Sequence, residues 1–104
     1  MAQFDVYQNP NKETIQTVPY LLDLQADLLD NLTTRVVVPL VAATLMGRAV
    51  KHLNPRFKVK GEAVFMSTAE LAGVPRSALG EKVASLREQR KEIIAALDFL
   101  FTGF

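Results

Sequence analysis

The stretch Ser85-Leu-Arg-Glu-Gln-Arg-Lys-Glu-Ile-Ile-Ala-Ala-Leu-Asp-Phe-Leu-Phe-Thr-Gly-Phe104 predicts an amphipathic helix that stays apolar to its last residue. Ser85 and Glu88 have the spacing of a capping box, in which side chains satisfy free backbone N–H groups at a helix start. At about 100° per residue one face is apolar. This face contains Leu86, Ile93, Ile94, Leu97, Leu100, Phe101 and Phe104. Chain ends are usually polar and frayed, so this one predicts an interface or a binding device.

Three residues of this helix break the apolar pattern. Arg90 falls within the apolar face, where its stem would follow the core, and we expect its guanidinium to form a structural ion pair. Phe99 points away from that face, towards the side of Glu88 and Glu92, which indicates an exposed interface residue. Asp98 lies at the border and is either an ordinary boundary carboxylate or an acceptor that faces a partner.

Composition places the chain among small globular domains. Its 104 residues are 49% apolar, enough for one modest core, and we expect a single domain over residues 1–104. A net charge of +1 gives no electrostatic case for direct nucleic-acid binding. The absence of cysteine excludes disulfides and thiolate chemistry. Neither a secretory signal nor a membrane span is predicted, so the expected location is the cytoplasm.

The first half of the chain predicts strands. Residues 3–8 alternate polar and apolar side chains and precede a loop-like stretch at 9–13. Residues 18–30 fit both a helical period and a strand alternation, so periodicity leaves this segment open. Residues 35–42 are rich in β-branched side chains and predict a strand. Pro39 lacks an N–H, which predicts a bulge or an unpaired edge position there.

The second half predicts a hairpin and then a crossing segment. Residues 53–59 and 63–68 read as its two strands, with a short turn at Gly61-Glu62. Residues 70–80 carry two glycines and a proline and predict an irregular crossing to the helix. Several short strands followed by one helix indicate an α+β fold or a small barrel with an appended helix.

Groups suited to catalysis are scarce. His52 is the only histidine, and its place before a predicted strand indicates a solvated loop side chain. Asp23, Asp27 and Asp30 form the only carboxylate cluster. On a strand Asp23 and Asp27 would share a face without Asp30, so a solvated edge is favoured over a metal or acid–base site. With no nucleophile elbow or phosphate loop, we expect no catalytic residues, cofactor or metal.

Several pieces of the sequence together resemble the CcdB family, the toxins of toxin–antitoxin modules that poison DNA gyrase. These pieces are Gln3-Phe-x-Val-Tyr7, Asp23-Leu-Gln-x-Asp-Leu-Leu-Asp30, Arg35-Val-Val-Val-Pro-Leu40, Met66-Ser-Thr68 with Gly73-Val-Pro75, and the C-terminal helix that ends in Gly-Phe. Their order and spacing carry the resemblance, which covers nearly the whole chain.

The resemblance implies an α+β, mainly β fold: a small antiparallel SH3-like barrel with an additional small sheet and a C-terminal α-helix. It also implies that residues 18–27 form a strand. The expected protein is a non-enzymatic, cytoplasmic homodimer that binds the gyrase A subunit and traps gyrase on cleaved DNA, causing double-strand breaks. A CcdA-like antitoxin with a disordered C-terminal segment would neutralise it. Operator DNA would be contacted only through that antitoxin, in repression and plasmid maintenance.

The resemblance also implies which residues contact gyrase. They are Leu28, Leu29, Asp98, Phe101, Thr102, Gly103 and Phe104. The best-known family member has asparagine, tryptophan and isoleucine where this chain has Asp98, Thr102 and Phe104. Losing the tryptophan removes a large stacking surface, for which Phe104 offers a partial replacement.

Two alternatives follow from the same sequence. The barrel is also similar to that of MazF-like endoribonuclease toxins, with Arg35, Asp23 and His52 cast in acid–base roles. The chain has no excess of basic residues, and the sequence around His52 contains no acid or nucleophile, so both observations argue against the endoribonuclease. The other alternative is a homodimeric interaction module that has lost gyrase activity through Thr102.

Overall fold

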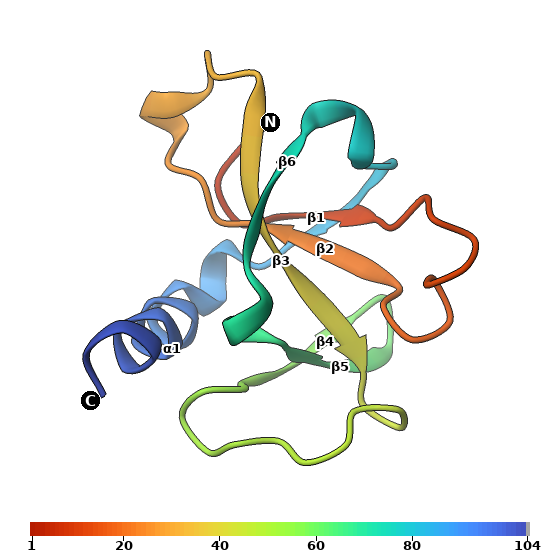
Figure 1. The fold of residues 1–104 in the computed structure, drawn as a ribbon, viewed down its shortest axis with the longest axis vertical. Helices are drawn as coiled ribbons and strands as arrows, with labels where there is room; N and C mark the ends of the chain where they lie inside the picture. Colours follow the sequence, from red (N-terminus) through yellow and green to blue (C-terminus); the bar gives the residue numbers. More distant parts are fainter. Residues whose placement is uncertain (104) are drawn as a thin grey trace.

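Short antiparallel strands and one C-terminal helix make up the fold (Figure 1). The structure, a computed structural model, describes residues 1–103. The strands are β1 (Asp5–Gln8), β2 (Tyr20–Asp23), β3 (Thr34–Ala42), β4 (Arg56–Val59), β5 (Glu62–Met66), β6 (Ala72–Pro75) and β7 (Lys82–Ser85), and the helix α1 is Arg90–Thr102. Four 3-10 turns connect them: η1 (Asp27–Leu29), η2 (Thr68–Glu70), η3 (Arg76–Ala78) and η4 (Arg87–Gln89). No helix among residues 1–103 is both long and apolar enough to cross a membrane.

All seven strands belong to one sheet with the order β4-β5-β3-β2-β1-β7, and β6 also pairs with β3. The long β3 runs through the centre of the molecule in Figure 1; its first half pairs with β6 and its second half with β5. The predicted fold class is therefore confirmed as α+β and mainly β, a half-barrel sheet with a C-terminal helix. The additional small sheet that we expected is not separate, because β6 pairs with β3 in the same sheet.

Pro39 lies inside the central strand, opposite Leu21 of β2, and not at the predicted bulge or unpaired edge position. The Pro39 C=O accepts the Ser67 N–H at 2.9 Å. The N and C=O of one strand residue point to the same side of the strand. The Pro39 nitrogen, which has no hydrogen to donate, therefore faces the gap between the parts of β3 that pair with β5 and with β6. Pairing with β5 begins at Leu40 and pairing with β6 ends at Val37, so the missing N–H costs no ladder bond.

The predicted hairpin is β4 and β5, with its turn one residue earlier than expected. Lys60 and Gly61 both have positive φ, 50° and 82°, which is the backbone of a two-residue type I′ turn. Phe57 and Val59 are buried while Lys58 between them is exposed, so the alternation correctly predicted the face that joins the core.

Three predicted segments differ from the structure. The strand expected over 18–27 is only β2, because the chain leaves the sheet after Asp23 to form η1. The irregular crossing over 70–80 contains β6. Ser85 ends β7, paired with Asp5, and does not cap a helix. Its Oγ accepts the Arg87 N–H at 3.3 Å, and α1 begins only at Arg90, so the predicted capping box is wrong.

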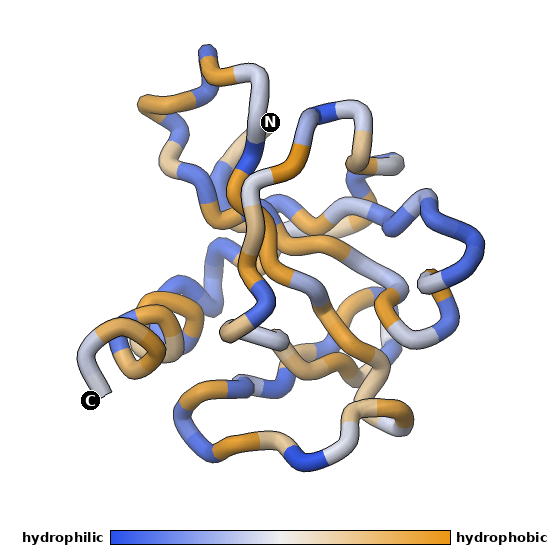
Figure 2. The backbone as a smooth tube through the Cα atoms, in the orientation of Figure 1, coloured by the Kyte–Doolittle hydropathy of each residue, from blue (hydrophilic) through white to orange (hydrophobic). Residues whose placement is uncertain are grey.

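The apolar face of α1 packs into the core as predicted, with two corrections. Ile93 and Ala96 are fully enclosed, in one cluster with strand residues that include Leu22, Val38 and Met66. Leu97 packs against that cluster only in part, and Phe101 is 72% exposed although it was placed on the same face. Figure 2 shows hydrophobic residues along the central strands and helix, and hydrophilic ones along outer loops such as the β1–β2 connection.

Candidate partner-binding site

The turn η1 displays two leucines to solvent. The Leu28 side chain is 91% exposed and Leu29 is 47% exposed, and no residue of η1 is buried. Leu32, three residues further along the same loop, is 49% exposed. Monomeric proteins seldom gather large apolar side chains in one exposed loop without a use for them. These leucines are candidates for contact with a partner.

Polar contacts hold η1 against the body of the protein. The Gln3 N–H donates to Asp27 Oδ1 at 2.7 Å. Gln25 Nε2 donates to the Leu29 C=O at 2.9 Å, while its Oε1 accepts the Val36 N–H at 3.1 Å. Gln25 therefore links the C-terminal end of η1 to β3. Gln25 is itself buried.

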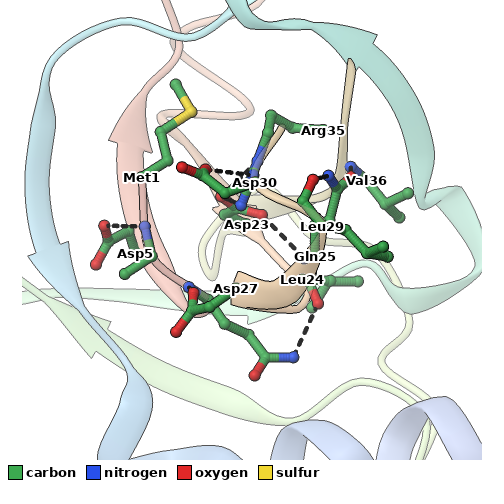
Figure 3. A network of polar contacts seen from close by, with 12 residues as sticks. Met1, Asp5, Asp23, Leu24, Gln25, Asp27, Leu29, Asp30, Arg35 and Val36 are labelled. Atoms are coloured by element: carbon green, nitrogen blue, oxygen red, sulfur yellow. Dashed lines mark hydrogen bonds and ion pairs between the residues drawn. The ribbon is translucent and has the colours of Figure 1, made fainter. Parts of the chain in front are cut away.

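A buried ion pair lies beneath this turn (Figure 3). Arg35 donates from Nε and Nη2 to Asp23 Oδ2 at 3.0 and 2.6 Å, and neither side chain is exposed. Arg35 Nη1 also donates to Asp30 Oδ1 at 2.9 Å. The expectation of a solvated carboxylate edge is therefore wrong for Asp23. The strand pairing places this residue beside β3, where Arg35 also points inward.

Burial shifts the proton affinities of two groups in this region. It raises the pKa of Asp23, against the opposing effect of the Gln25 N–H and of Arg35. Burial also raises the pKa of Tyr7 to about 12, with further contributions from the carboxylates of Asp5 and Asp23. The Tyr7 hydroxyl lies 3.4 Å from Asp5 Oδ2. In both cases burial removes hydration from the charged form of the side chain, which favours the neutral form. Tyr7 is therefore neutral at physiological pH.

The end of α1 gathers four of the other predicted site residues. Asp98, Phe101, Thr102 and Gly103 are all exposed. The Thr102 hydroxyl donates to the Asp98 C=O at 2.6 Å, so it is bonded back onto its own helix. Gly103 ends the helix in a left-handed conformation, with φ 83°, and its N–H donates to the Phe99 C=O. This is a glycine cap, which ends α1 at Thr102. Phe104 lies outside the described residues.

A cleft opens beside Asp98, between α1 and the loop before β4. Its volume is about 560 Å³, and it is lined by His52, Pro55, Glu92, Ala95, Asp98 and Phe99. The Phe99 ring is half-buried, 6.1 Å from the His52 ring between centroids, and is not the fully exposed side chain we expected. His52 is an exposed turn residue, as predicted, and has φ 71°, in the left-handed region that few residues other than glycine adopt.

Arg90 does not form the expected ion pair with any of the described residues and is exposed to solvent. Its guanidinium carbon lies 5.7 Å from the centre of the Phe4 ring, and Nη1 lies 3.4 Å from Gln3 Oε1. A cation–π contact at a largely exposed site thus replaces the predicted ion pair.

The predicted site residues form two separate groups on one chain. Figure 1 shows η1, drawn in orange, well away from the dark blue C-terminal end of α1. The residues in each group are close together along the chain, and all of those in the described part are exposed. A partner that contacts both groups must therefore cover a wide surface of one protomer or reach the two groups on different protomers.

No group of three or more His, Cys, Asp or Glu side chains among residues 1–103 could hold a metal ion. The acid–base set of the endoribonuclease alternative is not available to RNA, because Asp23 and Arg35 are both fully buried.

Three residues that support η1 were not predicted from the sequence: Gln25, Arg35 and Arg76, whose guanidinium donates to the Asp30 and Leu32 C=O groups. One signal was present. Arg35 opens an otherwise apolar, β-branched run, and an arginine that is buried needs a carboxylate partner. The three aspartates just before it could have supplied one.

One comparison with known proteins bears on this arrangement. The family model described as CcdB protein matches residues 3–103 of the 104-residue chain. The match spans every strand and the helix described above.

Proposed function

The chain belongs to the CcdB family, whose members are toxins of toxin–antitoxin modules, and on that premise we propose that it binds the DNA gyrase A subunit. It traps gyrase on cleaved DNA and so turns the enzyme into a source of double-strand breaks. This activity is binding and not catalysis, and the apolar side chains exposed on η1 and α1 support it.

The observation that carries the proposal is the exposure of apolar side chains at positions that match the family pattern. Leu28 is 91% and Phe101 72% exposed, which are the highest exposed fractions among the large hydrophobic side chains of residues 1–103. Apolar and aromatic side chains of this kind anchor protein interfaces, because a partner gains the free energy of removing them from water.

We assign the gyrase contacts to two groups. The first is Leu28 and Leu29 of η1, which act as apolar anchors. The second is the chain end, where Phe101 is a further anchor, Asp98 an exposed acceptor, and Gly103 a place for close approach of a partner backbone. Thr102 and Phe104 complete that group in this proposal.

The partners of the protein are a second copy of itself and an antitoxin. A two-fold homodimer would present both copies of each group to gyrase through one isologous arrangement. A CcdA-like antitoxin with a disordered segment could cover such a wide surface and remove the toxin from gyrase. Binding to operator DNA, and hence repression, would pass through that antitoxin, because a net charge of +1 offers little attraction to phosphate.

Expression in a gyrase-sensitive bacterium tests this proposal, with an isogenic strain that carries a toxin-resistant gyrase as control. The proposal expects killing of the sensitive strain only, and rescue by the co-expressed antitoxin. Equal killing of both strains would contradict gyrase as the target, and cleaved cellular RNA would point to the endoribonuclease alternative. Survival of both strains at full expression would favour the interaction module without gyrase activity.

A further inference from the structure

The loop that carries η1 receives little support from the hydrophobic core. None of the η1 residues is buried, and three leucines of residues 24–33 are largely exposed. A loop of this kind would ordinarily sample many conformations, and a partner would have to order it at a cost in free energy. The contacts that fix this loop are therefore polar ones.

From the side of β3, the loop is fixed through Asp30. Arg35 holds Asp23 with two of its nitrogens and uses the third, Nη1, to donate to Asp30 Oδ1 at 2.9 Å. Figure 3 shows the Arg35 side chain between the two carboxylates. Because Arg35 is fully buried, it has little freedom to move, and Asp30 is tied to a rigid point.

Arg76, which directly follows β6, also binds this loop. Its Nη2 donates to the Asp30 C=O and lies 3.3 Å from Asp30 Oδ1, and its Nε donates to the Leu32 C=O at 3.2 Å. One planar guanidinium thus bridges Asp30 and Leu32, which follow Leu28 and Leu29 in the loop. Arg76 is 37% exposed and lies in η3, so replacing it opens no cavity in the core.

We propose that Arg76, acting with the buried Arg35 through Asp30, is a positioning residue that preorders Leu28 and Leu29 for the gyrase A subunit. This role rests on the proposed function of the η1 leucines. Arg76 does not touch the partner. It lowers the cost of binding because the loop already has its bound conformation before the encounter.

Amide exchange in the free protein gives the first test. The Leu29, Asp30 and Leu32 N–H groups donate to carbonyls within the loop. In Arg76→Ala these three amides should exchange about tenfold faster or more, since local opening no longer breaks the guanidinium contacts. The amides of β3 should keep their rates. Unchanged exchange of the loop amides would overturn the proposal. Should Arg76→Ala fail to fold, Arg76→Gln, which keeps the stem and part of the donors, takes its place.

Binding to a purified gyrase A fragment gives the second test, through a double-mutant cycle with Leu28→Ala, Leu29→Ala. Arg76→Ala alone should weaken binding about fivefold to tenfold, the scale expected when a partner must order a few side chains. In the protein that lacks both leucines, Arg76→Ala should have almost no further effect. Arg48→Ala removes a charge from an exposed loop residue and should leave binding unchanged in both backgrounds.

The results distinguish a failure of the positioning role of Arg76 from a failure of the proposed gyrase contact by η1. Full affinity for Arg76→Ala, or an equal loss with and without the leucines, would overturn the positioning role. Undiminished binding of the Leu28→Ala, Leu29→Ala protein would instead contradict the assignment of η1 to gyrase, and the exchange rates would still decide whether Arg76 orders the loop.

Discussion

Arg35 and Asp23 form an ion pair that is closed off from water, with Arg35 Nη2 2.6 Å from Asp23 Oδ2 and both side chains fully buried. The pair joins β3 to β2 at the point where the chain leaves the sheet for η1. Burial raises the pKa of Asp23, against the opposing effect of the Gln25 N–H and of Arg35. Buried ion pairs of this kind often add little net stability, because the loss of hydration of both charges offsets their attraction.

Breaking this pair on one side should be costly. Asp23→Asn leaves the buried Arg35 without its main carboxylate and should reduce the free energy of unfolding by about 3–5 kcal/mol. Replacing both, as Asp23→Leu with Arg35→Met, should recover much of that loss because no charge stays buried. Urea denaturation measures both changes, with the exposed Glu13→Gln as a control expected to shift stability by less than about 0.5 kcal/mol. A single and a double variant of equal stability would contradict this account.

Within α1, Ile93 should matter more than Leu97 for stability. Ile93 is fully buried and Leu97 only in part, so Ile93→Ala should cost about 2–5 kcal/mol and Leu97→Ala less. Arg90→Ala should cost less than either, because the arginine makes only a cation–π contact and one long hydrogen bond. The same denaturation experiment ranks all three, and a larger loss for Leu97→Ala would show that the helix packs on a different face.

Tyr7 should make the protein less stable in alkali. Its pKa is about 12 in the folded state, against 10.0 for an ordinary tyrosine. Between these values the unfolded chain loses the proton first, so stability that is fully present below pH 10 is lost as pH rises towards 12, by about 1.4 kcal/mol per unit. Tyr7→Phe should flatten this decline.

Tyrosine absorbance can check the same shift directly. The chain has two tyrosines and no tryptophan, so Tyr20→Phe leaves Tyr7 as the only phenol. The phenolate band of that variant should appear with a midpoint near 12. A midpoint near 10 in the folded protein would contradict burial of the Tyr7 ring.

The glycine cap of α1 supplies a small, local contribution to stability. Gly103 has φ 83°, which an alanine adopts only with strain, so Gly103→Ala should destabilise the protein by about 1 kcal/mol. Gly47→Ala is the matched control, since an added Cβ there meets nothing within 4 Å. Equal effects of the two substitutions in thermal denaturation would show that the cap does not form.

Local patterns in the sequence were enough to predict β3, the β4–β5 hairpin and the apolar face of α1, because each depends on near neighbours. Ser85 shows where such reasoning fails. Its spacing to Glu88 favours a helix cap, but pairing with Asp5 across the sheet holds it in β7. The ion pair of Asp23 was missed for the same reason, since it requires the register between β2 and β3. Long-range pairing overrides local preference in both cases.

The candidate site was predicted unevenly. Leu28 and Phe101 were named through the family resemblance, and their exposure fits a partner-binding role. Helical periodicity alone placed Phe101 on the buried face, because a helical wheel does not show where the sheet beneath the helix ends. Gln25, Arg35 and Arg76 were not recognised, since they act through the backbone of a loop whose conformation no local pattern specifies.

Gyrase cleavage in vitro tests the central claim most directly. Purified protein is incubated with gyrase, supercoiled DNA and ATP, beside a variant that lacks Thr102, Gly103 and Phe104. The packed residues Ile93 and Ala96 remain in that variant, so it should keep its fold and the proposed dimer. The account predicts linear DNA with the full-length protein, the same or more with Thr102→Trp, and none with the truncated one. Absence of linear DNA with the full-length protein, or its full formation by a folded truncated protein, would contradict the account.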